Sequence, residues 1–287
     1  MKQPLFTGVC TALVTPFLGG KVNYPMLEII LRRQMDYGIP AVAICGTTGE
    51  APTLSDDEKL KLFQVSKEIC ENKMLMIAGT GSNDTYHAVM LSTAAEKAGA
   101  DGLLVVSPYY NKANPEGIYQ HYKAINDAVN IPIIVYNVPS RTGLDIPVDV
   151  YARLAELPNI AGIKEASTSI QKIGKILSTC SLPVWSGNDD MTVPAISLGA
   201  RGVISVLSNV SPLKSILMTE AALSGDFDTA ASLHSKLLPV MDALFCDVNP
   251  IPVKAAMKLI GYDCGDCRLP LTKLSEKKLS LLTSVMQ

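Results

Sequence analysis

Eight short apolar runs, rich in valine and isoleucine, recur between residues 9 and 206 and are separated by longer amphipathic stretches. The runs are Val9–Val14, Ala41–Cys45, Leu75–Ala78, Gly102–Val106, Ile131–Tyr136, Ile160–Lys164, Pro183–Ser186 and Gly202–Val206. Parallel strands that are buried on both faces have this composition, and the stretches between them have the pattern of helices that cover such a sheet. Eight strand–helix units in 287 residues predict an α/β protein of the (β/α)8 TIM barrel class, which typically needs about 250 residues.

An open, doubly wound sheet is the alternative that the same eight runs allow. Such a sheet usually carries a glycine-rich dinucleotide-binding loop directly after its first strand. After Val14 the chain continues with Thr15, Pro16 and Phe17, which do not form a loop of this kind. We therefore expect the closed barrel.

The strand pattern stops near Gly225, and the residues that follow have the periodicity of helices. Three helices are expected, over Asp226–Phe245, Ile251–Ile260 and Ser275–Met286. We therefore divide the chain into a barrel, residues 1–224, and a C-terminal three-helix extension, residues 225–287. An apolar stripe on the first of these helices is expected to pack against the barrel or against another subunit, and the pattern does not separate the two.

Charge and cysteine content exclude several classes of function. The net charge is −2 and no run of lysine or arginine occurs, so we expect no nucleic-acid partner. Without a signal peptide or an apolar run of membrane-spanning length, a cytoplasmic protein with no membrane partner is expected. The seven cysteines fit reduced thiols. The pair Cys264 and Cys267 lacks the further ligands of a zinc site, so a plain loop is expected there and no metal.

Polar groups follow the predicted strands at the end where barrels of this class place their active sites. They are Gly46-Thr47-Thr48-Gly49-Glu50, Gly79-Thr80-Gly81, Pro108-Tyr109-Tyr110-Asn111, Tyr136-Asn137, Lys164-Glu165, Gly187-Asn188 and Ser205. Hydroxyls, backbone donors, a phenol and one amine would converge there, with Gly187 among the candidate substrate contacts.

Lys164 ends a short apolar strand, so its ammonium would lie at the rim of a buried sheet. A poorly solvated amine there favours the neutral form, which is nucleophilic toward carbonyl groups. Alternatively, the stem of Lys164 is buried while its head reaches water or pairs with Glu165. The spacing alone leaves both interpretations open.

Tyr136 and Arg141 are the two side chains expected near Lys164. Tyr136 ends the preceding strand, where a phenol is placed either to relay protons to a carbinolamine on Lys164 or to cap the barrel interior. Arg141 lies in the expected loop Pro139-Ser140-Arg141-Thr142-Gly143 over the same face. Its guanidinium is suited to grip a substrate carboxylate, and a surface salt bridge is the alternative.

Three motifs together carry a resemblance to a known family. They are Gly46-Thr47-Thr48-Gly49-Glu50, Tyr136-Asn137-Val138-Pro139-Ser140-Arg141-Thr142-Gly143 and Gly162-Ile163-Lys164-Glu165. With them, the chain resembles the dihydrodipicolinate synthase (4-hydroxy-tetrahydrodipicolinate synthase) family of the pyruvate-dependent class I aldolase superfamily. The likeness extends from Phe6-Thr7-Gly8 through Asn249-Pro250-Ile251-Pro252-Val253-Lys254 to Arg268-Leu269-Pro270.

The resemblance implies a condensation of pyruvate with L-aspartate 4-semialdehyde, the first committed step toward diaminopimelate and lysine, without a metal or organic cofactor. Lys164 would form the imine with pyruvate. Tyr136, Thr47 and Tyr110 match the proton-relay triad of the family. Tyr110 would come from a neighbouring subunit, so a homo-oligomer, either a dimer or a tetramer, is expected.

The same resemblance assigns the substrate contacts. Thr48 matches the residue that binds the pyruvate carboxylate, and the backbone near Ile204 would border the imine. Arg141 matches the residue that holds the carboxylate of the semialdehyde. Related N-acetylneuraminate lyases and 2-keto-3-deoxygluconate aldolases share the lysine and the tyrosine but are not expected to place an arginine there.

The resemblance also implies an effector site for lysine. At this site the sequence departs from the residue pattern of bacterial enzymes that lysine inhibits. Tyr109 and Asn83 match that pattern. The residues Ala51, Pro52, Asp56, Lys59 and His87 stand where inhibited enzymes commonly have Ser, Ala, His, His and Glu. Without a carboxylate at position 87, and with Lys59 repelling a cation, we expect weak or absent inhibition by lysine.

Two classes of function remain, an imine-forming lyase and a catalytically silent barrel that serves as a binding module. The joint presence of Lys164, Tyr136 and Arg141 favours the enzyme.

Overall fold

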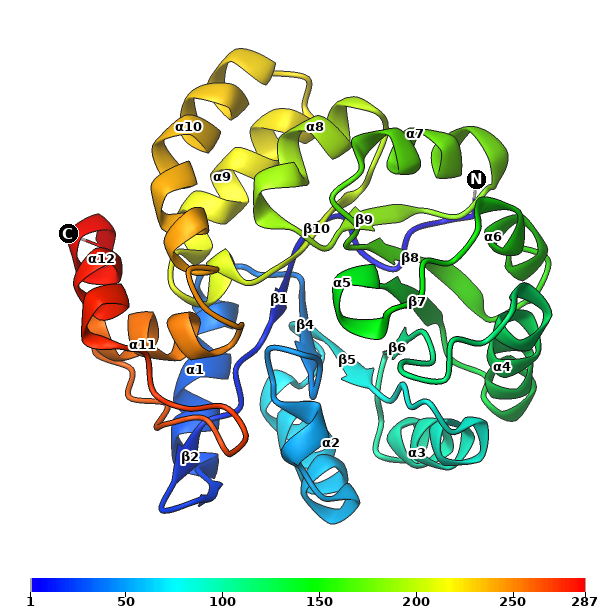
Figure 1. Cartoon of the computed structure of the whole chain (residues 1–287), viewed down its shortest axis with the longest axis horizontal. Helices are drawn as coiled ribbons and strands as arrows, with labels where there is room; N and C mark the ends of the chain where they lie inside the picture. The colour runs from blue at the N-terminus through cyan, green and yellow to red at the C-terminus, as the bar shows by residue number, and fades with distance from the viewer. Residues whose placement is uncertain (1, 287) are drawn as a thin grey trace.

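Eight parallel strands close into a barrel in the computed structural model, which describes residues 2–286 (Figure 1). The barrel strands are β1 (Gly8–Ala12), β4 (Ala41–Ile44), β5 (Leu75–Gly79), β6 (Gly102–Val106), β7 (Ile133–Asn137), β8 (Ile160–Glu165), β9 (Val184–Ser186) and β10 (Gly202–Ser205). Each strand pairs with its neighbours in chain order, and β10 pairs with β1 to close the ring. The predicted (β/α)8 barrel is therefore confirmed.

Helices surround the barrel and cover the outer face of its strands (Figure 1). They are α1 (Tyr24–Asp36), α2 (Asp56–Cys70), α3 (Thr85–Lys97), α4 (Pro115–Ala128), α6 (Val148–Leu154), α7 (Ile170–Thr179), α8 (Thr192–Ser197) and α9 (Pro212–Leu223). The short α5 (Pro139–Thr142) lies inside this ring, after β7 (Figure 1). Capping residues in the sequence explain where several of these helices begin. For example, α2 begins with a capping box in which Ser55 and Glu58 satisfy each other's backbone amides.

The alternation of side chains along the strands creates two apolar layers. The barrel interior contains a cluster that includes Cys10, Ile134, Tyr136, Trp185 and Ile204, with Phe6 stacked on Trp185. A larger cluster fills the space between the strands and the surrounding helices. The interior of the barrel is thus a packed core.

The C-terminal segment forms the three expected helices, α10 (Phe227–Ala243), α11 (Ile251–Leu259) and α12 (Glu276–Met286). The apolar stripe of α10 is turned inward, since Leu237 and Met241 are buried within the main core cluster, and α10 lies beside α9 of the barrel (Figure 1). The stripe therefore packs within the chain. The division at residue 225 stays a proposal.

Three features differ from the sequence-based expectations. A small antiparallel hairpin, β2 (Phe17–Leu18) with β3 (Lys21–Val22), follows β1 and was not expected. The segment expected as a loop around Arg141 forms one helical turn, α5, which begins with Pro139 at its first position and ends at Gly143 in the left-handed region. Short 3-10 helices also occur at Ala51–Thr53, Asp189–Met191 and Leu207–Asn209.

Within residues 2–286, no helix has the length and apolar character needed to cross a membrane. Across the same residues, no group of three histidine, cysteine or acidic side chains is arranged to hold a metal ion. Cys264 and Cys267 lie in an irregular segment between α11 and α12, as the sequence suggested, and both are free thiols.

Candidate active site

A cavity of about 530 Å³ opens at the C-terminal ends of the barrel strands. Its walls come from residues that follow β4, β5, β6 and β7, and from two segments of the C-terminal extension. The lining includes Cys45, Gly46, Thr47, Glu50, Gly79, Gly81, Val106, Tyr109, Tyr136, Val138, Arg141, Thr142, Val248, Asn249, Pro250, Pro270 and Leu271. The extension therefore forms part of the wall of the mouth.

Lys164 and Tyr136 lie side by side at the top of the barrel interior. They are partners in the register between β8 and β7, and the Lys164 Nζ atom lies 4.4 Å from the centre of the Tyr136 ring. Tyr136 lines the cavity, while only 5% of Lys164 is exposed. The amine is thus held against a phenol in a nearly dry site.

Neither alternative interpretation of Lys164 fits this arrangement. With 5% of its surface exposed, the side chain does not reach into water. Glu165 is the next residue on the same strand, so its carboxylate lies on the opposite face of the sheet and bonds to other partners. Cys10, in the same interior cluster, is not a competing nucleophile, because burial raises the pKa of its thiol to about 12.

Gly187 leaves room for the stem of Lys164. A Cβ atom at Gly187 would lie 2.5 Å from the Ala166 Cβ atom and 3.1 Å from the Lys164 Cε atom. A side chain there would push against both residues, so a glycine is required. Ile204, on β10, is fully buried in the interior cluster that also contains Tyr136.

Asn249 connects the motif after β4 to Arg141, a role that the sequence analysis did not assign to it. Its Nδ2 atom donates to the Thr48 Oγ1 atom at 3.0 Å, and its backbone carbonyl accepts from the Arg141 Nη2 atom at 3.0 Å. The Oδ1 atom of Asn249 is buried and has no hydrogen-bond partner among residues 2–286. Asn249 also lines the cavity, so it links Thr48 and Arg141 at the wall of the mouth.

A buried ion pair fixes the end of the loop that carries Thr47 and Thr48. Glu50, in the left-handed region at φ 57°, has its carboxylate 2.6 Å from the Lys254 Nζ atom, and both side chains are buried. The backbone amide of Arg268 donates to the other oxygen of Glu50 at 2.9 Å. A second part of the extension is thereby tied to the loop that carries Thr47 and Thr48.

The chain matches the model of the dihydrodipicolinate synthetase family over residues 5–287. It belongs to this family. A curated relative, the 4-hydroxy-tetrahydrodipicolinate synthase of Acetivibrio thermocellus, is 45% identical, and the match covers 100% of this chain and 98% of the relative.

Solved structures agree with the family assignment. The dihydrodipicolinate synthase of Thermotoga maritima superposes with a TM-score of 0.96 at 44% identity, and the match covers 98% of each chain. The enzyme of Cyanidioschyzon merolae, solved with lysine bound, superposes with a TM-score of 0.96 at 38% identity, covering 99% of this chain and 98% of that one.

Of the three expected relay residues of this dihydrodipicolinate synthetase family member, Tyr110 alone lies away from the cavity of its own chain. Its side chain is 88% exposed, and it does not line the cavity that Thr47 and Tyr136 line. Its backbone is held in the left-handed region at φ 71°, a strained conformation for a tyrosine. Contribution of Tyr110 to a neighbouring subunit stays a prediction.

Most of the expected effector residues line the same cavity. Ala51, Lys59, His87 and Tyr109 line it, while Asn83 does not. Asp56 joins two of them, since its carboxylate accepts from the Lys59 Nζ atom at 3.3 Å and lies 2.9 Å from the His87 Nε2 atom. Partial burial would raise the pKa of Asp56, but the contacts with His87 and Lys59 outweigh it and lower the pKa below its usual value.

Proposed function

We propose that the protein is a 4-hydroxy-tetrahydrodipicolinate synthase, which condenses pyruvate with L-aspartate 4-semialdehyde through an imine on Lys164. The observation that carries the proposal is the buried Lys164 amine held against the Tyr136 ring, at a mouth that Arg141 lines. Membership of the family and the full-length match to named synthases support it. The reaction is the first committed step toward diaminopimelate and lysine.

The first half of the reaction builds a nucleophile from pyruvate. The neutral Lys164 amine attacks the keto carbon, the carbinolamine loses water, and a protonated imine forms. Its nitrogen accepts the electron pair released when a methyl proton leaves, which gives the enamine. Tyr136 and Thr47 would move these protons, with Tyr110 of a neighbouring subunit completing the relay. Thr48, held by Asn249, would bind the pyruvate carboxylate.

The second half joins the two substrates. The enamine carbon attacks the aldehyde carbon of the semialdehyde, and the aldehyde oxygen takes a proton. The amino group of the semialdehyde then attacks the imine carbon, closes the ring and releases the Lys164 amine. Arg141 would hold the carboxylate of the second substrate.

Borohydride trapping tests the imine directly. Treatment with pyruvate and borohydride should leave a permanent adduct on Lys164 and none on Lys254, which is also a buried lysine. Lys164→Arg should abolish the adduct, and peptide mass mapping locates it. A folded protein that gives no adduct would support a silent binding module.

A substrate panel then separates this activity from those of related aldolases. Aspartate semialdehyde with pyruvate should be turned over, while N-acetylneuraminate and 2-keto-3-deoxygluconate should not be cleaved. Arg141→Lys should raise KM for the semialdehyde about 10- to 100-fold, because one hydrogen bond to a charged group is lost, and should leave pyruvate trapping intact. Efficient cleavage of the sugar acids with no use of the semialdehyde would refute the assignment.

We also propose that the active form is a homo-oligomer, a dimer or a tetramer, since Tyr110 is exposed and separate from the cavity of its own chain. Light scattering on the purified protein tests this, and a fully active monomer would contradict it. The seven free cysteines support a reducing, cytoplasmic location.

A further inference from the structure

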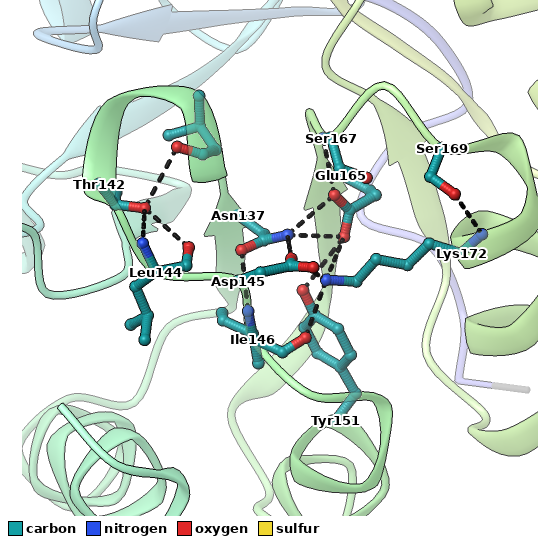
Figure 2. A network of polar contacts seen from close by, with 11 residues as sticks. Asn137, Thr142, Leu144, Asp145, Ile146, Tyr151, Glu165, Ser167, Ser169 and Lys172 are labelled. Atoms are coloured by element: carbon teal, nitrogen blue, oxygen red, sulfur yellow. Dashed lines mark hydrogen bonds and ion pairs between the residues drawn. The ribbon is translucent and has the colours of Figure 1, made fainter. Parts of the chain in front are cut away.

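A polar network that includes Asn137 and Glu165 lies at the ends of β7 and β8 (Figure 2). Asn137 follows Tyr136 on β7 and Glu165 follows Lys164 on β8, and the two strands are paired in register at both levels. Because neighbouring residues of a strand point to opposite faces, each reactive side chain in the interior has one of these polar residues behind it.

Glu165 is the centre of this network and is fully buried. Its Oε1 atom accepts from the Asn137 Nδ2 atom at 2.9 Å and from the backbone amide of Ser167 at 2.8 Å. Its Oε2 atom accepts from the Tyr151 hydroxyl at 3.2 Å and lies 3.9 Å from the Lys172 Nζ atom. A carboxylate with this many partners in a dry site has one stable position, and the ends of β7 and β8 are fixed through it.

Asn137 extends the same network to the segment that follows α5 (Figure 2). Its Nδ2 atom also donates to the Asp145 Oδ1 atom at 2.9 Å, and its Oδ1 atom accepts from the backbone amide of Ile146 at 3.2 Å. Lys172 binds the same segment, through the Asp145 carboxylate and through the carbonyl of Ile146 at 2.9 Å. The turn that carries Arg141 is therefore held at both of its ends.

We propose that Asn137 and Glu165 are positioning residues for the reaction, which together set the separation of Lys164 and Tyr136 and the placement of the turn that carries Arg141. This inference rests on the proposed imine chemistry. It goes beyond that chemistry because neither residue faces the cavity or touches a substrate. A displacement of about 1 Å at a reacting centre costs as much as a hundredfold in rate, so loss of this support should appear in the kinetics.

The test compares four full-length variants by borohydride trapping and steady-state kinetics. Asn137→Ala removes both arms of the network, Glu165→Gln keeps its volume but removes its charge, and Tyr151→Phe removes one hydrogen bond. The matched control is Asp101→Asn, which removes the ion pair with Lys67 at the opposite end of the barrel and leaves one oxygen to accept from the amide of Met76.

At saturating pyruvate, Asn137→Ala and Glu165→Gln should slow trapping about tenfold or more, and Tyr151→Phe by a smaller factor. Asn137→Ala should also raise KM for the semialdehyde, because it frees the turn that carries Arg141. The control should lose thermal stability and keep the wild-type trapping rate and KM values. Tyr151→Phe and Glu165→Gln preserve side-chain volume, so they provide the test if Asn137→Ala does not fold.

The outcomes are distinguishable from failure of the proposed function. If the wild type traps pyruvate and the folded variants trap it at the same rate with the same KM values, the positioning role is refuted and the imine chemistry stands. If the trapping rate falls in proportion to the loss of thermal stability, so that the Asp101→Asn control slows as much as Glu165→Gln, the positioning role is also refuted. If the wild type forms no adduct, the proposed function fails and this inference falls with it.

Discussion

The buried ion pair between Lys254 and Glu50 allows a quantitative test of how the C-terminal extension supports the barrel mouth. The Lys254 Nζ atom lies 2.6 Å from the Glu50 carboxylate, and the side chains are 3% and 1% exposed. In Lys254→Met the carboxylate would stay buried without its cation. Removing one partner of such a pair costs about 3–5 kcal/mol of unfolding free energy.

The corresponding change in melting temperature follows from the size of the chain. Unfolding entropy is about 2.1 cal/mol/K per residue, which for a chain of this length gives about 0.6 kcal/mol/K. Lys254→Met should therefore lower Tm by about 5–8 °C. Differential scanning calorimetry measures this, with Lys123→Met, in the exposed pair with Asp127, as a control that should show no resolvable change.

The double variant Glu50→Gln with Lys254→Met separates the ion pair from general damage to the core. Once Lys254 is replaced, loss of the negative charge removes the unpaired ion, so the double variant should be no less stable than Lys254→Met alone. A Tm decrease below about 2 °C for Lys254→Met, or strict additivity in the double variant, would show that the pair does not support the mouth.

Three further predictions concern pH, the space around Lys164 and regulation. Burial lowers the pKa of His121 from 6.5 to about 4, so on acidification the unfolded chain binds a proton before the folded chain does. This residue should therefore lower the free energy of unfolding by about 3 kcal/mol between pH 7 and pH 4. In thermal melts across this range, Tm should fall less steeply with pH for His121→Gln than for the wild type, and an equally steep fall would contradict the assignment. Gly187→Ala should slow borohydride trapping about tenfold or more, because its Cβ atom would lie 3.1 Å from the Lys164 Cε atom, and wild-type trapping would show that the site adapts. L-Lysine at physiological concentration should inhibit weakly or not at all, since Lys59 lines the cavity and Asp56 is already bonded to Lys59 and His87. Strong inhibition in an activity assay would refute this.

The barrel was predictable because buried strands impose a strong local pattern. All eight runs coincide with strands, with ends shifted by at most two residues, as at Ile131 and Val14. The hairpin at Phe17–Val22 and the turn α5 were missed because two-residue strands and a single helical turn are too short to show a period.

The site was predictable only in part, because its parts meet over long distances in sequence. Lys164 and Tyr136 were found because each ends an apolar run. Asn249 bonds to Thr48 across 201 residues, a contact that no local pattern encodes. The orientation of Glu165 was predictable from the sequence, since the alternation of side chains along a strand places it on the face opposite Lys164.

The cavity at the barrel mouth has a consequence for the order of events during synthesis. Its wall needs Asn249, Pro270 and Leu271, which leave the ribosome only after every strand of the barrel. Since nascent chains fold from the N-terminus onward, the sheet is able to close around Lys164 before the pocket that receives substrates is complete. In a nascent chain, Lys164 and Tyr136 would thus lie together before the wall of the cavity is complete.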